Sequence, residues 1–187
     1  MTGEISAALK EWQGVCRALA RGRQCVLLRK GGIYEAGGEF EVEHRRFVLF
    51  PTWLHQSPRM VRADFHADLE IRTDEPARIP IAAAAEVERV IPLRTRSQMD
   101  AIRSEHIWTD TLIDMRFAYR PENPLYLLVV RVWNLPEAVE LENTPAYAGC
   151  KSWVPLELPI RVDGAAPAMP DEEFGLRLER ICEAVGS

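Results

Sequence analysis

Ten residues between Arg29 and Gln56 have side chains or backbones suited to binding an anion or a metal ion. They are Arg29, Lys30, Gly31, Gly32, Glu35, His44, Thr52, Trp53, His55 and Gln56. A strand that ends in Arg-Lys and is followed by Gly-Gly lets bare backbone N–H groups approach a phosphate while the cations supply charge. His55 and Gln56 follow a Pro-Thr break and add neutral donors, and Trp53 offers an aromatic face for stacking.

We therefore predict that these residues line one cleft, which binds nucleic acid (RNA or DNA), a nucleotide or another phosphate-bearing ligand. In this cleft Arg29 and Lys30 neutralise phosphate, and Glu35 or His44 contacts the edge of a base. The prediction requires two separate stretches of the N-terminal third to fold back toward one another.

Two other functions fit the same residues. Glu35, His44 and His55 are the ligand and base types that a metal-dependent hydrolase or nuclease uses. A protein–protein adaptor without a small ligand would be indicated by Trp53 on an exposed apolar patch. The same polar side chains also suit the solvated face of a hairpin. The sequence therefore leaves open whether the protein is an enzyme and whether it uses a cofactor.

Charge is distributed unevenly along the chain. The net charge of −5 disfavours bulk adhesion to nucleic acid. No acidic residue lies between Trp12 and Tyr34, however, and this stretch carries a run of basic residues: Arg17, Arg21, Arg23, Arg29 and Lys30. Such a run is typical of a solvated helix end and strand, or of a local anion-binding edge.

Several catalytic signatures are absent from the sequence. It contains no Walker A motif, no GxSxG motif and no HExxH motif. The four cysteines are Cys16, Cys25, Cys150 and Cys182. Because they lack tight spacing, we expect small buried side chains in a reduced protein rather than a zinc site.

The overall composition is that of a globular chain, with 187 residues, 47% of them hydrophobic and 27% charged. The apolar runs Ile79–Ala85 and Leu125–Val130 are far shorter than the ~20 residues of a membrane span. The first residues carry acids and lack the continuous apolar stretch of a signal peptide. We expect a cytoplasmic protein with one domain over residues 1–187, and residues 93–97 as an alternative boundary between two lobes.

Hydrophobic periodicity predicts three helices, which cover Ala7–Arg21, a short central segment that begins at Ser97, and Asp171–Ala184. Short strands are predicted over Gln24–Lys30, Arg46–Thr52, Asp64–Arg72, Ile79–Ala85, Val87–Leu93, Ile113–Tyr119, Leu125–Trp133 and Trp153–Leu158. Hairpins are expected around Glu35–Gly38 and across the turn that precedes Leu125. Since no βαβ rhythm is present, these elements predict an α+β fold with a mostly antiparallel, barrel-like sheet.

Two strings in the N-terminal part of the chain are specific, namely RKGGIYE at Arg29–Glu35 and FPTWLHQ at Phe50–Gln56. Together with ALKEW, RVWNLP and YAGCKSWVPL, they resemble the bacterial family called domain of unknown function 1802, from about Ala8 to Leu158. This resemblance implies a stand-alone bacterial cytoplasmic protein and brings no activity with it. Through Ala18–Lys30 and the string EVERVIPL, the chain also resembles the PUA-like barrels of the ASCH and EVE groups, which mostly bind RNA or modified bases.

Overall fold

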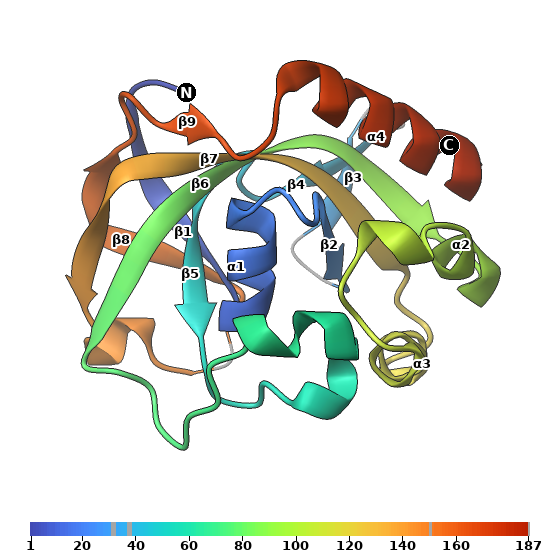
Figure 1. The fold of residues 1–187 in the computed structure, drawn as a ribbon, viewed down its shortest axis with the longest axis horizontal. Helices are drawn as coiled ribbons and strands as arrows, with labels where there is room; N and C mark the ends of the chain where they lie inside the picture. The colour runs from blue at the N-terminus through green and yellow to red at the C-terminus, as the bar shows by residue number, and fades with distance from the viewer. Residues whose placement is uncertain (31–32, 37–38, 150, 187) are drawn as a thin grey trace.

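The fold is seen in a computed structural model that describes residues 1–30, 33–36, 39–149 and 151–186. Side chains are described for the same residues except 33–36 and 39–41. Within this part of the chain, an α+β arrangement combines one large, mostly antiparallel sheet with helices from the N-terminal, central and C-terminal parts of the chain (Figure 1). The predicted fold class is therefore confirmed.

The large sheet has seven strands. They are β1 (Glu4–Trp12), β2 (Val26–Arg29), β5 (Arg46–Thr52), β6 (Arg78–Leu93), β7 (Leu125–Glu142), β8 (Trp153–Arg161) and β9 (Ala166–Pro167). Their order is β2-β7-β6-β5-β1-β8, with β9 paired to β7, and only β1 and β5 run parallel to each other. Because the described path ends at β2 and β8, the sheet is not a closed barrel. A separate hairpin joins β3 (Ile33–Ala36) to β4 (Glu39–Val42), as predicted.

The long β6–β7 ribbon forms the middle of the sheet. The two strands predicted at Ile79–Ala85 and Val87–Leu93 are one strand, because register shifts in β6 keep it paired with β7 along its whole length. β7 begins at Leu125 as predicted and continues to Glu142.

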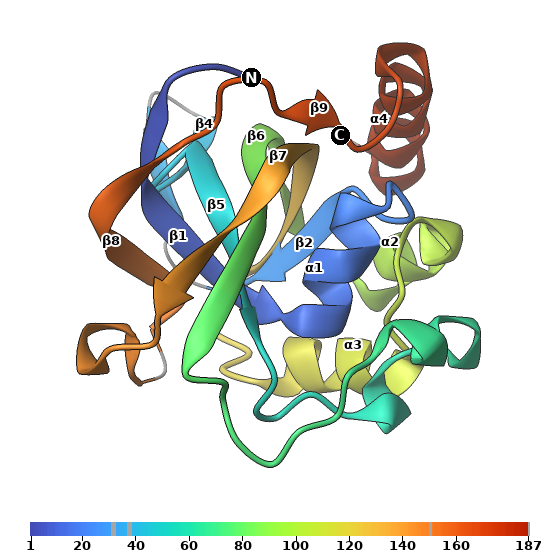
Figure 2. The same cartoon turned by 60° about the vertical axis from the view of Figure 1, so that its left-hand side comes forward.

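The α-helices are α1 (Gln13–Ala20), α2 (Arg96–Ala101), α3 (Asp110–Ala118) and α4 (Asp171–Val185). Four short 3₁₀ segments complete the structure, namely η1 (Pro58–Met60), η2 (Ala63–Asp68), η3 (Arg103–Glu105) and η4 (Pro145–Tyr147). Figure 2 shows α2 and α4 on the side of the molecule opposite β8, with α1 nearer the middle and α3 below it. The C-terminal helix matches its prediction within one residue. The central helix starts one residue earlier than expected, after Thr95 as its N-cap.

The predicted N-terminal helix over Ala7–Arg21 is wrong in its first half. Residues Glu4–Trp12 form strand β1, and the helix begins only at Gln13. Leu9 packs in one hydrophobic cluster and its neighbour Ala8 in the other, so β1 is buried on both faces. Pairing with β5 and β8 on both sides outweighs the helical spacing of Leu9, Trp12 and Cys16.

Two other predicted strands are helical. Residues Ala63–Asp68 form η2, and the predicted strand Ile113–Tyr119 falls within and just after α3. In α3 the buried residues are the adjacent Leu112 and Ile113, while Met115 and Tyr119 are about half exposed. A strand would bury alternate residues, so the apparent alternation did not reflect burial.

Candidate functional site

Arg29, the last residue of β2, reaches across the fold to the end of β1. Its Nη2 donates to Glu11 Oε2 at 3.1 Å and to the backbone oxygen of Lys10 at 3.2 Å. Both side chains of this ion pair are more than 90% buried. Burial lowers the pKa of the Arg29 guanidinium, and the Glu11 carboxylate opposes that shift. The Nε of Arg29 is buried and has no hydrogen-bond partner among the described residues.

Two more of the predicted residues meet the chain at the start of α1. Thr52 Oγ1 donates to the backbone oxygen of Glu11 at 3.2 Å. Gln56 Oε1 accepts from Gly14 N at 2.8 Å and so satisfies an N–H group in the first helical turn. Because β1 and β5 are parallel, their carboxyl ends lie side by side, and this places Thr52 and Gln56 beside the residues that Arg29 contacts.

Lys30 turns toward α3. Its Nζ donates to the backbone oxygens of Phe117 at 3.3 Å and Arg120 at 3.0 Å, at the C-terminal end of that helix. Arg116 also lies close enough to depress the pKa of Arg29, after the larger effect of burial. The end of β2 and the end of α3 thus bring together the side chains of Arg29, Lys30 and Arg116, which we call the cationic corner.

Trp53 does not offer an open stacking face. It is 5% exposed, and its Nε1 donates to Glu70 Oε2 at 3.2 Å. The backbone N–H groups of Trp53 and Leu54 both donate to the carboxylate of Glu75, at 2.9–3.1 Å. Since Trp53 is buried, it provides neither a platform for a base nor the exposed apolar patch that would indicate an adaptor.

His44 and His55 lie beyond opposite ends of β5. This strand has seven residues, and at ~3.3 Å per residue it alone spans about 20 Å. His44 contacts the edge of Trp153, with ring centroids 5.4 Å apart, and His55 is exposed with a φ of 68°. The separation is too large for both imidazoles to ligate one metal ion, which argues against the predicted metal site of Glu35, His44 and His55.

Some of the predicted site residues are not described by the structure, or only in part. Gly31 and Gly32 lie outside the described residues, as do Cys150 and the side chain of Glu35. Of the ten predicted residues, the structure brings Arg29, Thr52 and Gln56 together at the start of α1. It places Lys30 at α3 and separates His44, Trp53 and His55 from that group.

Comparison with known protein families assigns the chain to one of them. The model of the family described as "Domain of unknown function (DUF1802)" matches residues 8–180. The chain belongs to the DUF1802 family. This confirms the family suggested by the RKGGIYE and FPTWLHQ strings. No curated protein matches this DUF1802 chain.

Among solved structures, the DUF1802 chain is similar to ASCH proteins from Zymomonas mobilis. The crystal structure of ASCH from this organism has 10% identity and a TM-score of 0.49, with 92% of each chain covered. Its Y47F mutant has 11% identity and a TM-score of 0.48, with 81% of this chain and 89% of that chain covered. ASCH is one of the groups that the sequence itself resembled.

The sequence prediction did not include Arg116 of the cationic corner among its site residues. It placed Arg116 on a strand of a hairpin, whereas the structure has this residue in the last turn of α3. The predicted turn that begins at Arg120 is present, since Asn123 N donates to the backbone oxygen of Arg120 at 2.9 Å. A basic side chain is favourable in the last turn of a helix, but this signal carries information only once the segment is known to be helical.

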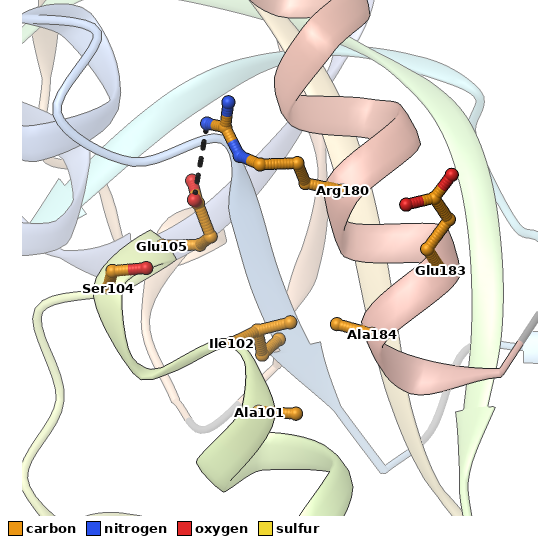
Figure 3. A pocket seen from close by; sticks show the side chains of 7 residues that line it. All are labelled: Ala101, Ile102, Ser104, Glu105, Arg180, Glu183 and Ala184. Atoms are coloured by element: carbon orange, nitrogen blue, oxygen red, sulfur yellow. Dashed lines mark hydrogen bonds and ion pairs between the residues drawn. The ribbon is translucent and has the colours of Figure 1, made fainter.

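A pocket of about 420 Å³ lies between η3 and the C-terminal half of α4 (Figure 3). None of the predicted site residues lines it. Arg180 Nη2 donates to Glu105 Oε1 across the pocket at 3.4 Å, and Arg177 lies 3.9 Å from the same carboxylate. The buried charge of Glu105 is therefore neutralised by α4 itself.

Among the described residues, no helix is both long and apolar enough to cross a membrane.

Proposed function

We propose that this DUF1802 protein binds a phosphate-bearing ligand, a nucleotide or a nucleic acid, at the cationic corner in the bacterial cytoplasm. The observation that carries the proposal is the buried Arg29, whose Nε has no partner in the part of the chain that the structure describes, while further cations lie beside it. A buried guanidinium with an unsatisfied N–H is costly, and an anionic oxygen is the group that would satisfy it.

The local balance of charge supports an anionic ligand. The corner has three basic side chains, and among the described side chains the acidic group that faces Arg29 is Glu11. Lys30 uses two of its three ammonium protons on the carbonyls at the end of α3, so one donor remains as far as the described residues are concerned. An isolated structural ion pair would need only Arg29 and Glu11.

The remaining predicted residues have distinct parts in this proposal. Thr52 and Gln56 orient Glu11 and the first turn of α1 and thereby hold Arg29 in place. Gly31 and Gly32 follow Lys30 directly, and close approach of their backbone to the phosphate stays a prediction. Because Trp53 is buried, recognition depends on charge and not on a base stacked against its ring.

Calorimetric titration with ATP, inorganic pyrophosphate and adenosine tests this function. The two phosphorylated probes should bind and adenosine should not. The variant K30Q/R116Q should weaken pyrophosphate binding at least about tenfold, as expected for the loss of a charge-assisted contact. Absence of binding by both phosphorylated probes, or unchanged affinity in this variant, would contradict the proposal.

A matched control removes the same charge elsewhere. Arg89 and Arg161 are exposed, and Arg161 lies beside Glu4 at the start of β1, seven residues before the Glu11 that Arg29 contacts. The variant R89Q/R161Q should therefore bind pyrophosphate as the unmodified protein does. Equal weakening in both variants would mean that only net charge matters.

A further inference from the structure

A second group of basic residues lies at the other end of α3, beside α1. It consists of Arg17, Arg21, Arg23, Arg59 and Arg62, and we call it the arginine face. Thr109 lies just before α3, and its Oγ1 donates to the backbone oxygen of Arg59 in η1 at 3.0 Å. This contact places the arginine face beside the start of α3. With nine residues, α3 is about 13 Å long, so the arginine face and the cationic corner are separate surfaces.

One buried carboxylate organises half of this face. Asp68 is 3% exposed, and its two oxygens pair with Arg21 and with Arg23, the latter at 2.9 Å. Arg17 donates to the backbone oxygen of the same residue at 3.3 Å. The side chains of Arg21 and Arg23 remain 52% and 42% exposed. Three guanidinium groups are thus held in place around one negative charge, with donors left over toward solvent.

The ring of Phe65 organises the other half. The guanidinium of Arg23 lies 4.3 Å and that of Arg62 4.9 Å from the ring centroid. Arg62 also donates to the backbone oxygen of Arg103 at 2.8 Å, and its buried Nε has no partner among the described residues. Arg59 is exposed next to them on η1. These contacts fix the orientation of two planar guanidinium groups.

The positive charge on this face exceeds what structure alone needs. The acidic groups paired with the five arginines are Asp68 and the exposed Asp64, which lies 3.6 Å from Arg62. Arg17 in α1 and Arg21 at its C-cap are four residues apart, a spacing at which like charges repel each other. The excess is the more notable because the whole chain has a net charge of −5.

We propose that the arginine face binds the sugar-phosphate backbone of a nucleic acid. Prearranged guanidinium groups fit phosphate oxygens, and the fixed side chains lose little conformational entropy on binding. Phe65 is only 6% exposed, so the face has no aromatic platform for bases among its described residues. Binding is therefore insensitive to base sequence and strongly dependent on salt. The face uses none of the side chains of the cationic corner and functions whether or not that corner holds a ligand.

Fluorescence anisotropy with labelled 20-nucleotide RNA and DNA oligomers of mixed sequence, over a series of salt concentrations, measures this binding. In the variant R17Q/R59Q both substitutions fall on exposed side chains, and the pairs of Asp68 with Arg21 and Arg23 stay intact. We expect affinity to fall at least about tenfold and the slope of log K against log salt to become shallower by about 1 to 2. The R89Q/R161Q control should keep the affinity and the slope.

Each outcome decides the proposal. Loss of oligonucleotide binding in R17Q/R59Q, with circular dichroism and pyrophosphate affinity unchanged, supports a separate nucleic-acid surface. If R17Q/R59Q keeps its affinity, if the control loses as much, or if the protein binds anionic lipid vesicles but no oligonucleotide, the proposal is wrong. When only K30Q/R116Q weakens both probes, the cationic corner accounts for all phosphate binding and the arginine face for none.

Discussion

Arg29 and Glu11 form a buried ion pair although β7, β6 and β5 separate their strands in the sheet. Side chains from β2 and β1 can meet only because the sheet curls until the two strands face each other. The pair is therefore a long-range contact between two strands that the sheet order separates, and it lies where the carboxyl ends of β1 and β5 meet the start of α1.

Removal of either partner should destabilise the protein strongly. E11L and R29M each leave a buried charge without its counterion, which typically costs about 3–5 kcal/mol. The double variant removes both charges, so its loss should be clearly smaller than the sum of the two single losses. Urea unfolding of the three variants at pH 7 measures the free energies of unfolding. Additive losses would show that the two side chains do not depend on each other.

Two glycine-to-alanine substitutions should have opposite effects. Gly22 has a φ of +65°, and a Cβ there would lie 2.6 Å from the backbone oxygen of Ala168. G22A should therefore destabilise the protein by about 1–3 kcal/mol. Gly175 lies within α4 with no atom near its Cβ position, so G175A should stabilise the protein by up to about 1 kcal/mol. Thermal unfolding compares the two. A similar melting temperature for both variants would contradict this account.

His106 should make stability depend on pH. It is 1% exposed, and neither ring nitrogen makes a well-formed hydrogen bond with the described residues. Burial, followed by the nearby Arg62, lowers the pKa of His106 from 6.5 to about 4. Between pH 4 and 6.5 the unfolded chain therefore binds a proton at His106 that the folded protein does not bind. The contribution of His106 to stability is fully present above pH 6.5 and declines as the pH falls toward 4. The full effect is on the order of 3 kcal/mol.

The variant H106L isolates this contribution. Denaturant unfolding between pH 7 and pH 5 should show a decline for the unmodified protein and a nearly flat profile for H106L. Asp110, whose pKa is lowered by its hydrogen bonds to Arg103 and Arg96, loses its contribution only at lower pH, below its ordinary value. An unchanged decline in H106L would assign the effect to another group.

Gln98 should link α2 to α4. Its Oε1 accepts from Arg94 N at 2.7 Å and Thr95 N at 3.0 Å, and its Nε2 donates to the backbone oxygen of Val185 at 2.7 Å. Q98A loses the cap of α2 and leaves the last carbonyls of α4 without this donor, so it should cost about 1–2 kcal/mol. Q98E keeps the acceptor and loses the donor, and its loss of stability at pH 7 should exceed that of a substitution at the exposed Ser97. Hydrogen exchange at the end of α4 checks the second contact.

Sequence reasoning located several elements correctly because their signals are local. The acids after Pro170 and the apolar stripe that follows predicted the C-terminal helix, and the apolar runs predicted β2, β5 and the start of β7. It failed at β1, where Leu9, Trp12 and Cys16 have helical spacing across a strand–helix junction. It also failed at α3, where polar and apolar residues alternate by chance.

The candidate site shows the same division between local signals and long-range contacts. Residue types alone singled out Arg29, Thr52 and Gln56, which the fold does bring to the start of α1. They could not reveal that Glu11 neutralises Arg29, that Glu75 anchors the loop at Trp53, or that β5 separates His44 from His55. Each of these arrangements depends on strand pairing between distant parts of the chain.

By itself, the sequence determined the α+β class, the ends of the better-defined elements and membership of the DUF1802 family, because composition, periodicity and motifs act over short stretches of chain. Only the tertiary structure decided which charges meet. Strand order, sheet curvature and the burial of ion pairs follow from contacts between residues far apart in the chain, whose free energies exceed local preferences.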